Sequence, residues 1–140
     1  MKNQTNAKAK TSQQSNTNGI AVVDVQAIVN SSAQVKALRE TQASKIEELN
    51  LWLQNAQNEV NTEQDKERQQ ALLQKYNAEF VLKKRDIALQ YQQELKIVSD
   101  NITQTVASEA KKKGFSMVIA KNIVVFGGED ITEEIAKIVN

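Results

Sequence analysis

The chain has 140 residues, 25% of them charged, and its 18 basic side chains nearly balance 17 acidic ones, which leaves a net charge of +1. This balance argues against a protein that is held to nucleic acid by bulk positive charge. The sequence contains no Cys and no His, which excludes zinc fingers, iron–sulfur sites, thiol nucleophiles and His-based catalytic triads. Pro is absent and Gly occurs only at positions 19, 114, 127 and 128, so composition predicts long helices between Gly19 and Gly114.

The first 19 residues are expected to form a disordered leader or linker, because residues 1–18 are almost wholly polar. Lys2, Lys8 and Lys10 are followed by no apolar stretch, so the segment does not resemble a secretory signal peptide. No run of the sequence approaches the ~18 apolar residues that a membrane-spanning helix needs.

A strand is predicted at residues 20–25, IAVVDV, which are short and β-branched and follow Gly19. Asp24 is placed to cap a helical turn over residues 25–29, and Ser31 with Gln34 suggests a capping box for the next helix. From there a seam with steps of three and four residues, and one four-residue stutter between positions 38 and 46, predicts a coiled-coil helix. Its members are Val35, Leu38, Gln42, Ile46, Leu49, Leu53, Ala56 and Val60, with Trp52 beside them.

The seam stops in the polar stretch 61–70 and then resumes, with Lys83 or Lys84 where an apolar residue is expected. The interruption favours an antiparallel helical hairpin over residues 33–113, with its tip at about 61–70, against a single straight helix of about 80 residues. Asn61 and Thr62 are placed to end one helix and cap the next. The second seam comprises Leu73, Tyr76, Phe80, Ile87, Tyr91, Leu95, Val98, Ile102, Val106 and Ala110.

The C-terminal part reads as a helix end followed by strands and a last short helix. Lys111–Lys113 before Gly114 is typical of a helix C-terminus. Residues 115–120 and 123–126 are predicted to pair as a tight β-hairpin, and Asp130 to cap the final helix. The predicted fold class is α+β, mainly α, with a small β body formed by residues 20–32 and 114–140 and a long antiparallel coiled-coil arm.

The β body is predicted to form a homo-oligomer. About 40 ordered residues rarely bury enough apolar surface to be stable alone without a disulfide or a metal. The open edges of its strands also need partners.

No catalytic site is predicted. The paired carboxylates Glu47-Glu48 and Glu133-Glu134 are neighbours in helices and do not face each other. Gly127-Gly128 lacks the remaining residues of a phosphate-binding loop, and Glu129-Asp130 beside it would repel phosphate. We therefore expect no enzyme, no cofactor and no metal site.

Two groups of arm residues allow both a structural and a functional interpretation. The basic clusters are Lys83-Lys84-Arg85 and Lys111–Lys113. In the structural interpretation they keep the chain soluble, and Lys111–Lys113 interact with the dipole at the helix C-terminus. In the functional interpretation they attract acidic clients or lipid headgroups. The large side chains Trp52, Tyr76, Phe80 and Tyr91 are expected between the helices. Leu72, Leu82 and Leu89 lie off the seam and form a further packing layer or hold an apolar client.

The two ends of the chain resemble the Skp/OmpH family of periplasmic chaperones. The resemblance rests on IAVVDVQAIV with Asp24, and on GFSMVIAKNIVVFGGEDITEEIAKIVN after the helical hairpin, and it spans residues 19–140. It implies a homotrimer whose arms hold unfolded outer-membrane proteins in the periplasm without ATP. The best-known members of the family are strongly basic, whereas this chain is nearly neutral. This departure counts against electrostatic capture of acidic clients and leaves at most a weak association with membrane surfaces. Individual client-binding residues remain unknown.

The leading hypothesis is therefore an ATP-independent holdase, and the alternative is a coiled-coil structural or adaptor protein of the cell envelope. Apolar side chains facing the space between arms favour the first, and uniformly polar faces the second. A cytoplasmic prefoldin-like chaperone ranks third, because the end segments resemble Skp/OmpH.

Overall fold

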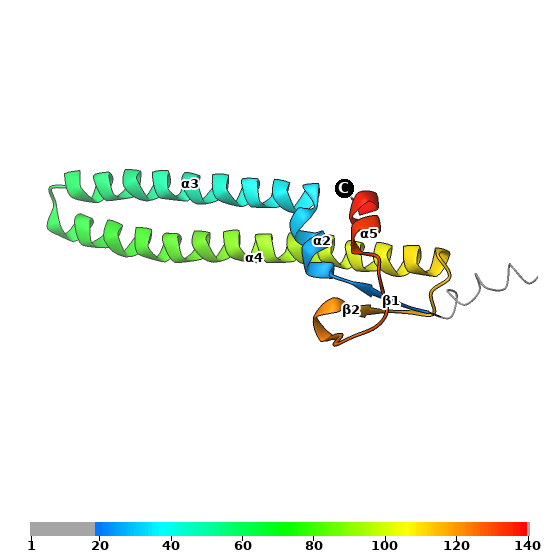
Figure 1. Cartoon of the computed structure of the whole chain (residues 1–140). Helices are drawn as coiled ribbons and strands as arrows, with labels where there is room; N and C mark the ends of the chain where they lie inside the picture. Colours follow the sequence, from blue (N-terminus) through cyan, green and yellow to red (C-terminus); the bar gives the residue numbers. More distant parts are fainter. Residues whose placement is uncertain (1–18, 140) are drawn as a thin grey trace, which may run out of the picture. The chain divides into compact units, whose positions relative to one another are not determined.

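The computed structural model of the chain describes residues 19–139 (Figure 1). The predicted leader, apart from Gly19, lies outside these residues. The chain divides into two compact units: the arm, Ala37–Lys96, and a body made of both chain ends up to Lys36 and from Ile97. The start of the first long helix and the end of the second thus belong to the body.

The sheet of the body is parallel and has the order β2-β1-β3, with β1 at Ile20–Val23, β2 at Met117–Ala120 and β3 at Glu129–Asp130. Ile20 pairs with Met117, and Ala21 pairs with Glu129 on the other side. β1 is the central strand and consists of apolar residues, of which Ala21 and Val23 are fully buried.

Helices α2 (Val25–Ser31) and α5 (Thr132–Val139), together with the part of α4 (Lys66–Lys112) from Ile97 on, complete the core of the body. α2 supplies Ile28 and Val29, α4 supplies Ile102, Val106 and Ala110, and the last segment supplies Ile131 and Ile135, all of which are buried. The small core therefore joins segments from opposite ends of the sequence.

The predicted β-hairpin of residues 115–120 and 123–126 is wrong. Lys121–Ile123 form a short 3₁₀ turn, and β2 pairs with β1 instead. A two-residue hairpin turn needs left-handed backbone, and no non-glycine residue among the described ones has a positive φ. Residues 124–128 therefore continue as a loop until β3 takes the other side of β1.

The arm is an antiparallel hairpin, as predicted, and not a straight helix (Figure 1). α3 spans Ala33–Thr62 and α4 spans Lys66–Lys112, joined by residues 63–65 inside the predicted polar stretch. The cap of α4 is Asp65, whose carboxylate accepts a 2.9 Å hydrogen bond from the Glu67 N–H, and not Asn61-Thr62. Gln69 also donates to the Val60 carbonyl at 2.9 Å, which ties the start of α4 to the end of α3.

The predicted seam of α3 is wrong at one position. Ile46 is 45% exposed, whereas Lys45 and Trp52 are half-buried. The inward side of α3 centres on Gln42, Leu49 and Ala56, which are seven residues apart, and half-buried side chains flank this line on both sides: Lys45, Trp52, Leu53 and Val60. Lys45 is thus the better covered of the two neighbours, and its Nζ donates to Gln90 Oε1 on α4 at 2.7 Å.

The predicted helix ends in the body are largely confirmed. Asp24 accepts a 3.0 Å hydrogen bond from the Ala27 N–H and caps α2. For α3 the capping side chain is buried Ser32, which accepts from the Gln34 N–H, rather than Ser31. After α4, Gly114 has a φ of 91°, and the Phe115 N–H donates back to the Ala110 carbonyl, as in a Schellman motif.

Candidate functional surfaces

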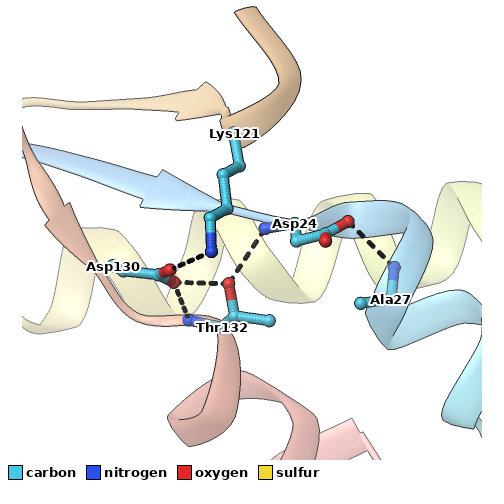
Figure 2. Close-up of polar contacts among 5 residues, drawn as sticks. All are labelled: Asp24, Ala27, Lys121, Asp130 and Thr132. Atoms are coloured by element: carbon cyan, nitrogen blue, oxygen red, sulfur yellow. Dashed lines mark hydrogen bonds and ion pairs between the residues drawn. The ribbon is translucent and has the colours of Figure 1, made fainter. Parts of the chain in front are cut away.

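A polar cluster lies where the three parallel strands end (Figure 2). Asp24 follows β1, Lys121 follows β2, and Asp130 ends β3. The Thr132 hydroxyl accepts from the Asp24 N–H at 2.9 Å and donates to Asp130 Oδ1 at 2.5 Å. The Thr132 N–H and the Lys121 ammonium, both 2.9 Å away, also contact the Asp130 carboxylate. One carboxylate therefore connects the ends of β2 and β3 with the start of α5.

These contacts stabilise the ionised form of Asp130. Hydrogen bonds from the Thr132 hydroxyl and N–H, and then from Lys121, lower the pKa of Asp130 to about 2. The cluster has no His or Cys, and within residues 19–139 no group of three His, Cys, Asp or Glu could hold a metal ion. The arrangement fastens the strand ends to α5, which is a structural role.

Gly127 and Gly128 form the turn that leads into β3, with φ values of 97° and 84°. A Cβ on Gly128 would lie 2.4 Å from Cγ2 of Val22 and 3.3 Å from the Ile20 carbonyl oxygen. Gly128 is therefore required by its close approach to β1.

The loop between β2 and β3 carries the most exposed apolar side chains of the body. We call residues 123–126 the apolar loop: Ile123 is 71% exposed, Phe126 is 92% exposed, and Val125 is fully exposed. Met117 on the neighbouring strand β2 is half exposed. So exposed a group of large apolar side chains is uncommon on a small soluble body.

On one lateral side of the arm, aromatic and charged side chains surround a shallow groove of about 470 Å³. The Trp52 and Tyr76 rings meet edge to face with centroids 5.7 Å apart, and Lys83 Nζ lies 5.2 Å from the Trp52 centroid. Lys83 thus covers Trp52 where an apolar residue was expected. The groove is lined by Lys45, Glu48, Leu49, Trp52, Lys83, Asp86 and Ile87.

Near the tip on the same side, the Tyr76 hydroxyl donates to the Glu59 carboxylate. This bond raises the pKa of Tyr76, and the nearby carboxylate of Glu79 adds to the effect. The large side chains of this side of the arm are thus engaged between the helices, as predicted for Trp52 and Tyr76.

A second groove, of about 310 Å³, is lined by uncharged side chains of both helices. It lies near the tip of the arm and contains no charged side chain. Its lining consists of Leu53, Ala56, Gln57, Val60, Asn61, Leu73, Tyr76 and Asn77. Further apolar side chains of the arm are exposed to between 42% and 63%, namely Ile46, Leu51, Leu73, Val81, Leu82 and Leu89.

The remaining candidate residues have ordinary surroundings. Glu47, Glu48 and Glu133 are exposed, and Glu134 is paired with Lys113 at 2.6 Å. Lys112 pairs with Glu109 at 3.1 Å. Phe80 and Tyr91 are half-buried, as interhelical packing requires, and so is Leu72. Sequence reasoning missed the apolar loop as a surface, because β-branched residues 123–126 were assigned to a paired strand.

The fold defines the class of protein: a long helical hairpin and a small parallel sheet built from both chain ends. Among solved structures, a crystal structure from Caulobacter crescentus, of a protein described as an OmpH-like outer membrane chaperone, matches with a TM-score of 0.69. It covers 87% of this chain and 83% of that chain at 18% identity, so the likeness shows the fold. No curated protein matches the chain.

The family described as outer membrane protein (OmpH-like) matches residues 19–139. The chain therefore belongs to the OmpH-like family, which confirms the resemblance drawn from the two ends of the sequence. Among the described residues, none of the helices is both long and apolar enough to cross a membrane.

Proposed function

We propose that this chain is an ATP-independent holdase of the periplasm that binds unfolded outer-membrane proteins between the arms of a homotrimer. Membership of the OmpH-like family supports a chaperone role. In such a mechanism many weak apolar contacts hold the client, and the charged positions of the arms keep the complex in solution.

The observation that carries the proposal is the apolar surface left exposed on the arm. Two helices bury only the side chains of their shared seam, and Ile46, Leu73 and Val81 remain 42% to 63% exposed. An arm that served only as a spacer would favour polar residues at these positions. The apolar arm therefore supports the holdase above the coiled-coil adaptor.

Self-association is supported by the apolar loop of the body. Val125 and Phe126 are almost completely exposed, and each apolar side chain of this size gains about 1.5–3 kcal/mol when it is fully buried. Strands β2 and β3 are the edges of a three-stranded sheet and can accept another chain. We therefore infer that the body assembles copies of this chain; the number three follows from the family.

The holdase is tested by diluting a urea-unfolded outer-membrane β-barrel protein into buffer with and without this chain, in the absence of nucleotide. Suppressed light scattering, with about three chains per client in the complex, is the expected result. A protein of unrelated sequence and equal helix content serves as the control. Unchanged scattering with a well-folded oligomer would reject the holdase for this class of client and favour the adaptor.

Cell fractionation tests the compartment separately. Recovery of the protein in the periplasmic fraction is expected. Recovery in the cytoplasm would instead favour the prefoldin-like alternative, even if scattering is suppressed.

A further inference from the structure

The arm has two lateral faces of different chemistry, because consecutive residues flank the seam on opposite sides. On α3 the pairs are Lys45 and Ile46, Trp52 and Leu53, and Glu59 and Val60, repeating every seven residues. One residue of each pair is polar or aromatic and the other is apolar. The charged face is defined by Lys45, Glu48, Trp52, Glu59, Glu79, Lys83 and Asp86, and the apolar face by Ile46, Asn50, Leu53, Gln57, Val60, Leu73, Asn77, Val81, Lys84 and Ala88.

Contacts place the residues of both helices on these faces. The groove of about 470 Å³ brings Trp52 of α3 together with Lys83 and Asp86 of α4, and so belongs to the charged face. The groove of about 310 Å³ brings Leu53 and Val60 together with Leu73 and Asn77, and belongs to the apolar face. Each face therefore extends across both helices.

The distribution of charge separates the two faces further. The charged face carries four carboxylates, at Glu48, Glu59, Glu79 and Asp86, together with Lys45 and Lys83. Lys84 is the single charged residue in the set that defines the apolar face, which otherwise consists of aliphatic side chains and the amides of Asn50, Gln57 and Asn77. None of the residues that define the apolar face therefore has a carboxylate that would repel an acidic ligand.

We propose that the apolar face is the client-contacting face of the arm, and that its occupant is an extended stretch of unfolded polypeptide with apolar and acidic side chains. This inference rests on the proposed holdase function. Ile46, Leu73 and Val81 are 42% to 63% exposed and can bury apolar side chains of the client. The amides can donate to and accept from its backbone, and the Lys84 ammonium attracts its carboxylates.

The first test compares two double variants. Ile46→Asp with Val81→Asp places carboxylates on the apolar face, whereas Leu51→Asp with Leu89→Asp places them opposite the seam, two positions after Leu49 and Ile87. The side chains removed are 45% and 63% exposed in the first variant and 57% and 46% exposed in the second, so the pair is matched. The first variant is expected to bind the unfolded β-barrel protein about tenfold more weakly, and the second within about twofold of the natural chain.

A second measurement uses the absence of Cys from the chain. Val81→Cys and Leu89→Cys each receive a thiol-linked photoreactive group, and the adduct with the client is measured. Cross-linking from position 81 several-fold above that from position 89 is expected. Because single surface substitutions leave the seam intact, this measurement stands even if the double variants unfold.

The charge of the occupant is tested with two peptides that share apolar residues but carry either Glu or Lys between them. The natural chain is expected to prefer the Glu peptide, and Lys84→Glu to abolish the preference, with a smaller difference at high salt. Equal losses in both double variants, equal cross-linking, or no preference between the peptides would overturn the inference while the natural chain still suppresses aggregation. If the natural chain does not suppress aggregation, the proposed function itself fails.

Discussion

Replacement of Gly128 by Ala should destabilise the body more than any other single-methyl addition in the turn before β3. The backbone at Gly128 has a φ of 84°, which costs an L-residue about 1–2 kcal/mol. The new Cβ would also lie 2.4 Å from the buried Val22 side chain, and such overpacking costs about 1–3 kcal/mol. The free energy of unfolding should therefore fall by about 2–5 kcal/mol.

Gly127→Ala is the matched control. Gly127 has a similar φ of 97°, but its Cβ would meet no atom within 4 Å, so we expect a loss of only about 1–2 kcal/mol. Urea unfolding followed by circular dichroism measures both variants at one chain concentration, since assembly would shift apparent stability. Equal losses, or a Gly128→Ala protein as stable as the natural one, would refute the argument from the contact with β1.

Three further predictions concern the body and the arm. The pKa of Asp130 is lowered to about 2 in the folded chain, so its contribution is complete above pH ~4 and is lost as the pH falls toward ~2. Because this carboxylate is partly exposed, we expect on the order of 1 kcal/mol or less, and Asp130→Asn should flatten the unfolding free energy across that pH range. Lys45→Leu should raise the free energy of unfolding by up to about 1 kcal/mol, measured as a higher melting temperature, because Lys45 is half-buried beside the seam; a decrease would reject an inward position for residue 45. Val125→Glu with Phe126→Glu should reduce the mass in solution to that of one chain while helix content is retained; an unchanged oligomer would exclude the apolar loop from assembly.

The helices were predictable because their signals are local. Asp24 and the Lys111–Gly114 segment lie within one turn of the helix ends that they define. The polar stretch that separates the seams likewise contains the observed connection, residues 63–65. Even so, Asp65 rather than Asn61-Thr62 caps α4, because several residues in that stretch are suitable caps.

The candidate surfaces were less predictable than the helices. Spacing places Leu72, Leu82 and Leu89 off the seam, and of these Leu82 and Leu89 are about half exposed whereas Leu72 is half-buried. The exposure of residues 123–126 was not predicted, because a β-branched segment has the same sequence pattern whether or not a strand lies beside it.

Local sequence patterns specify the long helices, the place where they reverse and the apolar β1 strand, because heptad spacing and capping act over a few residues. The partners of β1 depend on the tertiary structure. Ser116 donates to the Gly19 carbonyl across 97 positions, and β3 reaches the other side of β1 only because Gly128 allows the close approach. The tertiary structure also decided that Lys45, and not Ile46, faces the second helix. Strand pairing and seam register depend on contacts between distant segments, which local patterns do not encode.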